Sequence, residues 1–135
     1  MILIDTSVVV QLLRDRTGVA AKNWRKLTAR QDFVLCRVSQ LELLQGARND
    51  GEWDELDTYL DGQDYIEMEA PHWRDAARIY FELRRGGLTV RSVIDCVIAQ
   101  IAIENKLTLA HQDRDFEVIN RVRPALRQKR VDLLA

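Results

Sequence analysis

The sequence predicts an α/β protein in which helices cover both faces of a mainly parallel sheet. Strand-like and helix-like segments alternate along the chain, and the strand-like segments are short apolar runs. Acidic residues stand at several points where a strand or loop leads into a helix. Alternating elements of this kind build a parallel sheet, because each helix carries the chain back to the edge where the next strand starts.

Each element is predicted from a local pattern. Four apolar runs indicate strands at residues 1–5, 33–36, 65–68 and 107–110. Periodic apolar positions and end signals indicate helices at residues 6–14, 19–30, 39–46, 52–60, 71–86 and 92–106, with a short helix after Asp113. Pro71 suits the first turn of the long helix, and Gly86 with Gly87 suits its end. Residues 124–134 show no clear pattern.

Composition predicts one ordinary globular domain over residues 1–135. Hydrophobic residues make up 47% of the chain and charged residues 30%, and the net charge of −1 excludes a polycation. Cys36 and Cys96 lie in apolar contexts without CxxC spacing, which favours buried free thiols over a disulfide framework or a zinc site. Without a basic leader or an apolar run of roughly 18 residues, we expect a cytoplasmic protein that does not contact a membrane.

Four carboxylates are the candidate functional residues. Asp5 closes the first strand and Asp113 follows the fourth, whereas Glu42 and Asp95 fall in the first turns of predicted helices. Ligands of parallel α/β folds bind at the carboxyl ends of the strands, so all four side chains could meet at one edge. Asp95 interrupts an otherwise apolar helix, where an ionised carboxylate is costly unless it is paired or holds a metal. Gathered carboxylates indicate Mg²⁺ and phosphoryl chemistry.

The same acids also suit helix starts. Two pairs have the spacing of a capping box: Ser39 with Glu42, and Ser92 with Asp95. Asp5 and Asp113 could each be an ordinary N-cap. Capping explains each helix start separately, but it does not explain why all the starts would gather at one edge. Metal binding and capping therefore both remain open at this point.

Four short motifs follow one another along the whole chain. They are Ile4-Asp5-Thr6-Ser7, Ser39-x-x-Glu42-Leu43-x-x-Gly46, Thr89-Val90-Arg91-Ser92-x-Ile94-Asp95-Cys96-x-Ile98-Ala99 and His111-x-Asp113-Arg114-Asp115-Phe116. In order and spacing the set resembles the PIN-domain ribonucleases, and among them the VapC-like toxins of bacterial toxin–antitoxin pairs. Each motif alone is weak, but the ordered set is specific.

The resemblance implies a three-layer α/β/α PIN-like fold and a toxin that cleaves RNA. We expect an Mg²⁺-dependent endoribonuclease, with Mn²⁺ as a substitute, that leaves a 5′-phosphate and a 3′-hydroxyl on tRNA or rRNA. Asp5, Asp95 and Asp113 would coordinate the metal, directly or through water, and Glu42 would hold or orient a water molecule. These four are the expected catalytic residues.

Two further residues of the motifs would orient the metal ligands. Ser7 lies two positions after Asp5, and Asp115 lies two positions after Asp113. Hydrogen bonding at a helix start is an equal alternative for Ser7, as is capping for Asp115. Family members vary in the last motif, so either Asp113 or Asp115 could face the metal; Asp113 is the favoured ligand.

Basic residues are the candidate contacts to RNA. Arg91 stands four residues before Asp95 and would reach the scissile region. Arg127, Lys129 and Arg130 cluster near the C-terminus, where they could bind phosphates. A solvated surface or a dimer contact would explain that cluster equally well.

The resemblance also implies protein partners. VapC-like toxins form homodimers, sometimes within larger assemblies, and are blocked by a VapB-like antitoxin whose C-terminal segment covers the acidic pocket. Apolar residues of the early helices could form the groove for such a segment, or they could belong to the core: Val8, Val9, Leu12, Leu13, Leu41 and Leu44.

Two other classes of function are weighed against this expectation. A PIN fold kept as a non-catalytic protein-binding module would be expected to have lost an acid, whereas this chain retains all of them. A receiver-like phosphotransfer domain typically places adjacent acids before the end of its first strand and a lysine after a late strand. Here a lone Asp5 precedes Thr6 and Ser7, so both alternatives are disfavoured.

Overall fold

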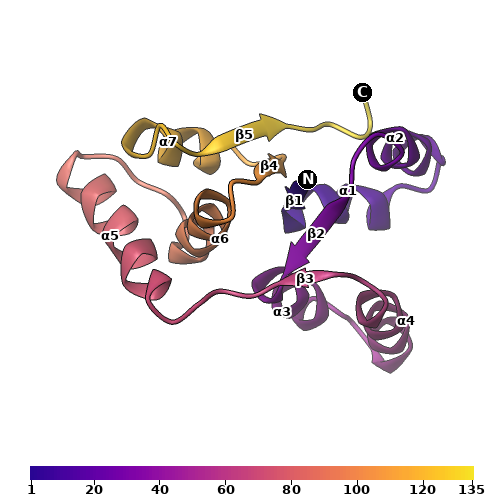
Figure 1. Ribbon diagram of the computed structural model, residues 1–135. Coiled ribbons are helices and arrows are strands. Elements are labelled where there is room, and N and C mark those ends of the chain that lie inside the picture. The colour runs from indigo at the N-terminus through magenta and orange to yellow at the C-terminus, as the bar shows by residue number, and fades with distance from the viewer.

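The structure, a computed structural model that describes residues 1–135, is a parallel sheet between two layers of helices (Figure 1). The strands are β1 (Ile2–Ile4), β2 (Phe33–Cys36), β3 (Tyr65–Ile66), β4 (Thr108–His111) and β5 (Arg127–Arg130). The helices are α1 (Thr6–Arg14), α2 (Val19–Thr28), α3 (Arg37–Gln45), α4 (Asp50–Asp61), α5 (His72–Arg85), α6 (Val93–Glu104) and α7 (Asp115–Val122). The predicted α/β class and parallel sheet are confirmed.

The order of the strands places the start of the chain at the centre of the sheet. The order is β3-β2-β1-β4-β5, and every neighbouring pair is parallel. The chain winds outward from β1 through β2 to β3 and then crosses to the other side to form β4 and β5. The winding direction reverses between β1 and β4, and such a switch point is where doubly wound sheets bind ligands.

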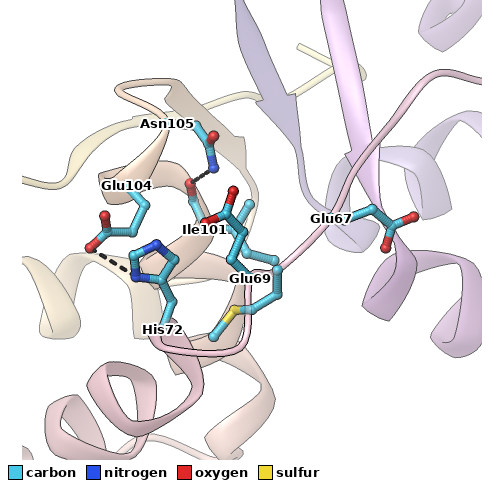
Figure 2. A pocket seen from close by; sticks show the side chains of 7 residues that line it. Glu67, Glu69, His72, Ile101, Glu104 and Asn105 are labelled. Carbon is cyan, nitrogen blue, oxygen red and sulfur yellow. Dashed lines mark hydrogen bonds and ion pairs between the residues drawn. The ribbon is translucent and has the colours of Figure 1, made fainter.

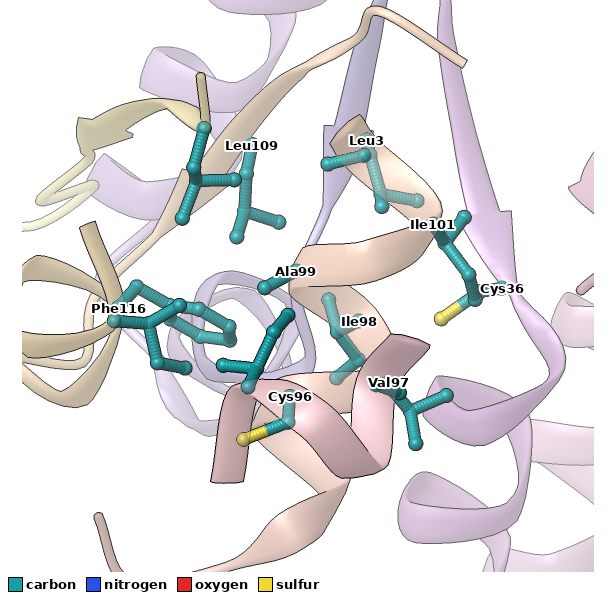
Figure 3. Close-up of a cluster of buried hydrophobic side chains, with 14 of the residues drawn as sticks. Leu3, Cys36, Cys96, Val97, Ile98, Ala99, Ile101, Leu109 and Phe116 are labelled. Atoms are coloured by element: carbon teal, nitrogen blue, oxygen red, sulfur yellow. The ribbon is translucent and has the colours of Figure 1, made fainter. Parts of the chain in front are cut away.

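Alternate residues of the central strand enter two separate cores. Leu3 points into the larger core, which also contains Leu109 of β4, residues of α6 such as Ile98, and Phe116 of α7 (Figure 3). Ile2 and Ile4 point into the second core, beneath helices α1 to α4. Helix α6 contributes a run of seven buried residues, Cys96 through Ala102. Because α6 is packed in this way, its first turn is held firmly at one edge of the sheet.

The helix after β2 begins earlier than the sequence pattern predicts. Helix α3 starts at Arg37, directly after the last strand residue, and Ser39 is buried inside it and does not cap it. The guanidinium of Arg37 lies 3.9 Å from the ring centroid of Tyr65 and forms an ion pair with Glu67. The capping box of Ser39 with Glu42 is therefore wrong, and Glu42 lies in the second turn of the helix.

Both ends of the sheet also differ from the sequence prediction. The strand expected at residues 65–68 ends at Ile66. The segment without a clear pattern contains β5, whose residues Arg127 to Arg130 pair with Thr108 to His111. All four of its side chains are polar, so no apolar run marks it as a strand.

The C-terminal residues cross the sheet edge and tie it to the first two helices. The side-chain amide of Gln11 donates to the carbonyl of Val131 at 3.0 Å and accepts from the N–H of Leu133 at 2.8 Å. Asn23 donates to the carbonyl of Leu133 at 2.7 Å. The Leu133 side chain is buried in the second core, so this segment is part of the fold.

Two further expectations concern the cysteines and the membrane. Cys36 and Cys96 are both free and buried, as predicted. None of the helices combines the length and the hydrophobicity that crossing a bilayer would require.

Candidate active site

Asp5 stands at the junction of β1 and α1, beside the end of β4. Its backbone N–H donates to the carbonyl of Ala110 at 2.9 Å, and its carboxylate caps α1 by accepting from the N–H of Ser7 at 3.0 Å. The Ser7 hydroxyl donates to the same carboxylate oxygen and accepts from the N–H of Gln112 at 2.8 Å. Ser7 therefore ties the ends of β1 and β4 together around Asp5.

Asp95 lies half-buried in the first turn of α6, and its carboxylate accepts no hydrogen bond from the chain. The α6 cap is made by Ser92, whose hydroxyl accepts from the N–H of Ile94 at 3.1 Å. Burial, and to a smaller extent the charges of Asp113, Asp5, Asp115 and Glu42, together raise the pKa of Asp95 to about 7. Its environment therefore opposes ionisation, and the reach-back bond of a capping box is absent.

Asp113 and Asp115 complete a compact acidic group with Asp95. One ligand atom from each of the three residues lies within 4.8 Å of the others. Asp113 Oδ1 accepts from the N–H of Asp115 at 2.9 Å, but the N-cap position of α7 is Arg114, so Asp113 precedes the cap and the N-cap expectation for it is wrong. Its own N–H donates to Nδ1 of His111 at 3.1 Å, and His111 Nε2 lies 2.6 Å from Oε1 of Gln128 on β5.

Glu42 reaches the same region from α3. Its Oε1 accepts from the Thr6 hydroxyl at 2.9 Å. Burial raises its pKa, the bond from Thr6 opposes that shift, and the charges of Asp5 and Asp113 raise the pKa further. Glu42 and Asp5 thus lie near the compact group without belonging to it.

The structure therefore brings all five predicted acids to one edge of the sheet. In the compact group Asp115 takes the place that the sequence prediction gave to Asp5. Thr6 and His111 were not assigned a role in the site, although each bonds one of the acids. Thr6 could have been found, because it adjoins Asp5 in the first motif.

The predicted basic residues divide into separate groups. Arg91 lies at the acids, where it forms ion pairs with both Asp113 and Asp115. On β5 the side chains alternate between faces, so Arg127 and Lys129 point away from the face that carries Arg130. Arg130 pairs with Glu117 of α7 at 2.9 Å. The C-terminal cluster is thus spread over two faces of an edge strand.

A second group of potential metal ligands lies at the far end of α6. Nδ1 of His72 lies 3.5 Å from Asp75 and 3.4 Å from Glu104, beside a cavity of about 180 Å³ (Figure 2). Asp75 and Glu104 are solvent-exposed, and exposed carboxylates commonly gather without a metal ion. The group at Asp95 instead offers only oxygen ligands, which Mg²⁺ prefers. Its three carboxylates also lie close together although like charges repel one another. The carboxylates at the switch point are therefore the better candidate metal site.

Comparison with known proteins identifies the family. The PIN domain matches residues 2–122 of the chain. The chain belongs to the PIN-domain family. Ribonuclease VapC11 of Mycobacterium tuberculosis is 38% identical over 125 residues, which cover 90% of this chain and 93% of the relative. Ribonuclease VapC51 of the same species is 32% identical over 117 residues, or 87% and 83% of the two chains.

Solved structures show the same fold. VapBC2 from Rickettsia felis, bound to a DNA fragment from its promoter, superposes on this PIN domain with a TM-score of 0.79 and 22% identity. The match covers 98% of this chain and 100% of that one. The predicted resemblance to PIN-domain, VapC-like proteins is thus confirmed by sequence and by fold, and a receiver-like domain is excluded.

Proposed function

We propose that this PIN domain is an Mg²⁺-dependent endoribonuclease and the toxin of a toxin–antitoxin pair, acting in the cytoplasm. The observation that carries the proposal is the set of five carboxylates at the switch point of the sheet, with Asp95 destabilised as an anion when no cation is present. Curated relatives named as ribonucleases, at up to 38% identity, support the same activity.

The acids would coordinate a divalent cation in different ways. Asp95 and Asp113 would ligate Mg²⁺, or Mn²⁺ in its place, while Asp5 and Asp115 would bind it directly or through water. When bound, such an ion lowers the pKa of water and neutralises charge on phosphate oxygens. Glu42, whose carboxylate accepts from Thr6, would accept a hydrogen bond from a water molecule and orient it toward the phosphodiester. Ser7 keeps the Asp5 carboxylate in one orientation.

The substrate we propose is tRNA or rRNA, cleaved to a 5′-phosphate and a 3′-hydroxyl. Arg91 is the cation nearest the acids and is 74% exposed, so its outer face is free to meet a phosphate. Arg127 and Lys129 offer a second phosphate-binding surface along the exposed edge strand, whereas Arg130, on the other face and paired with Glu117, would contribute less.

The partners we propose are a cognate antitoxin and a second copy of the chain. The apolar residues of α1 and α3 fall into two sets, because Val8 and Val9 are core residues whereas Leu13 and Leu41 are 48% and 64% exposed. An antitoxin segment would cover the exposed set. The shared fold with a member of the VapBC family of toxin–antitoxin systems from Mycobacterium tuberculosis supports such a partner.

The proposal is tested with purified protein on mixed cellular RNA. Cleavage should require Mg²⁺ or Mn²⁺ and stop in EDTA. Asp5→Ala should abolish cleavage, and also the growth arrest expected when the toxin is expressed without antitoxin. Asp5→Asn keeps an oxygen for the α1 cap and should be equally inactive, whereas Asp54→Ala, at an exposed acid of α4, should behave as wild type. Full cleavage by either Asp5 variant would refute the proposed site.

A further inference from the structure

The side chain of Arg91 forms hydrogen bonds with two acids of the site. Its Nη2 donates to Asp113 Oδ1 at 2.7 Å, and its Nε donates to Asp115 Oδ2 at 3.0 Å. Its backbone N–H donates to the same oxygen of Asp115 at 3.1 Å. The loop before α6 is thereby joined to the start of α7, two segments that are 24 positions apart in the sequence.

The two acids each give one oxygen to Arg91 and keep the other. Asp113 Oδ2 and Asp115 Oδ1 accept no hydrogen bond from any group of the chain. Both residues also belong to the compact group with Asp95. The arginine therefore fixes the orientation of two carboxylates while leaving each of them an oxygen for a metal ion.

Solvent exposure affects the charge of Arg91 differently from its hydrogen bonds to the two acids, which are here called the Arg91 fork. The Arg91 side chain is 74% exposed, whereas those of Asp113 and Asp115 are 17% and 8% exposed. Water screens the charge of an exposed guanidinium, so its repulsion of a nearby cation is weakened. The orientation it imposes on a buried carboxylate is not screened. A planar guanidinium also offers two N–H directions at once, which the single ammonium of lysine does not.

We propose that Arg91 is a positioning residue of the metal site, which holds Asp113 and Asp115 in the orientation that binds the ion. The inference rests on the proposed metal-dependent function and deepens it. A residue that only contacted RNA would not affect metal affinity, and a residue that competed with the ion would lower it.

The test measures Mn²⁺ affinity in the absence of RNA, by the electron paramagnetic resonance signal of free Mn²⁺. Arg91→Ala should weaken affinity about 10- to 100-fold, the effect usual for residues that orient metal ligands. Arg91→Lys keeps the charge but not the fork and should be weakened nearly as much. Arg30→Ala removes an exposed arginine without an ion pair and should match wild type. Melting curves in EDTA establish that each variant is folded at the temperature of the titration.

A double-mutant cycle with Asp115→Asn shows whether Arg91 acts through that carboxylate. The loss of Mn²⁺ affinity caused by Arg91→Ala should be clearly smaller in the Asp115→Asn background, because the two changes break the same contact. Additive losses, an unchanged affinity in Arg91→Ala, a raised affinity, or wild-type affinity in Arg91→Lys would each overturn the inference. A wild-type protein that binds no Mn²⁺ would instead overturn the proposed function itself.

Discussion

Asp95 shows how folding and the proposed chemistry oppose each other at a single residue. The seven residues that follow it in α6 are buried, and four other acids raise its pKa further. Natural proteins keep such a conflict where the group has a task beyond stability. A cation bound among these acids would remove the conflict, because it favours the ionised form of every one of them.

The first prediction concerns Asp95→Asn in EDTA. The pKa of Asp95 is about 7 in the folded chain against a reference value of 3.8, so the folded state binds the extra proton between these pH values. Wild-type stability should therefore fall as pH rises through this range, and the penalty is complete above pH 7. The variant lacks the penalty and should be more stable at pH 8, on the order of 1–3 kcal/mol after allowance for solvent. Melting curves at several pH values measure it.

The same variant tests whether Asp95 binds the metal ion. Its stability advantage should disappear below pH 3.8, where the Asp95 carboxyl is protonated in both the folded and the unfolded wild type. Added Mn²⁺ should stabilise the variant less than wild type, because one ligand is weaker. Ser92 already caps α6, so an equal Mn²⁺ shift in the two proteins would show that Asp95 does not bind the ion.

At the scale of elements, the faces of α1 and α3 separate core from surface. Leu12 and Leu44 are partly buried against the second core, whereas Leu41 is the most exposed large aliphatic residue of α3. Helix α3 packs against α1, whose N-cap is Asp5, so the helix pair that carries these leucines extends to the edge where the acids lie. That continuity favours one segment of a partner covering both.

The second prediction is that Leu41→Glu impairs inhibition by the antitoxin and leaves RNA cleavage intact. A charge at the centre of an apolar contact is costly to bury, so affinity should fall at least tenfold. Trp73→Glu, at a residue 55% exposed on α5 in the opposite layer, is the matched control and should be inhibited normally. Equal inhibition of wild type and Leu41→Glu would show that the antitoxin docks elsewhere.

The edge strand β5 is the second element with a proposed role. Its exposed Arg127 and Lys129 carry no ion pair, whereas Arg130 is paired with Glu117. A cation without an ion pair can bind a phosphate without first breaking an existing contact. Arg127 and Lys129 should therefore contribute more to RNA binding than Arg130.

The third prediction is that Arg127→Ala with Lys129→Ala weakens RNA binding and flattens its salt dependence. The slope of log affinity against log salt should fall by about 0.7 for each phosphate that the variant no longer neutralises. Arg25→Ala with Lys26→Ala removes two exposed charges from α2 and should leave the slope unchanged. Binding isotherms of an inactive Asp5→Asn protein at several salt concentrations measure both; identical slopes in the two double variants would assign β5 a role outside RNA binding.

For the whole molecule, local patterns predict much of the fold. Helix α1 has its predicted bounds, Thr6 to Arg14, because the Asp5 cap and the apolar spacing are both local signals. The gathering of acids also follows from the alternation of elements, since parallel strands end at one edge. These predictions succeed because each depends on residues close in sequence or on a general rule of topology.

The remaining features depend on contacts between distant residues. Strand β5 reads Arg-Gln-Lys-Arg, and only its pairing with β4 makes it a strand. Charged side chains suit an exposed edge because they discourage pairing with another chain. The hydrogen bonds of Arg91 to the two acids could not be predicted from the sequence either, since they form only when the loop before α6 meets the start of α7. Neither contact has a local signal in the sequence.

The last prediction tests whether the C-terminal segment is part of the cooperative fold. Leu133 is 1% exposed and fills the second core, while its backbone is held by Gln11 and Asn23. Leu133→Ala should lower the free energy of unfolding by about 2–5 kcal/mol, because it removes buried methyl groups and leaves a cavity. Leu134→Ala, next to it but 54% exposed, should change stability by no more than about 0.5 kcal/mol.

Urea unfolding followed by tryptophan fluorescence and by circular dichroism would measure both leucine variants. Trp24 packs against Phe33 beneath β2 and belongs to the same core as Leu133, so its signal reports on this side of the sheet. Coincident transitions from the two probes would show that the segment unfolds with the whole molecule. If Leu133→Ala were as stable as Leu134→Ala, the residues after β5 would contribute little to stability, and β5 would be held by its pairing with β4 and its contacts with α7.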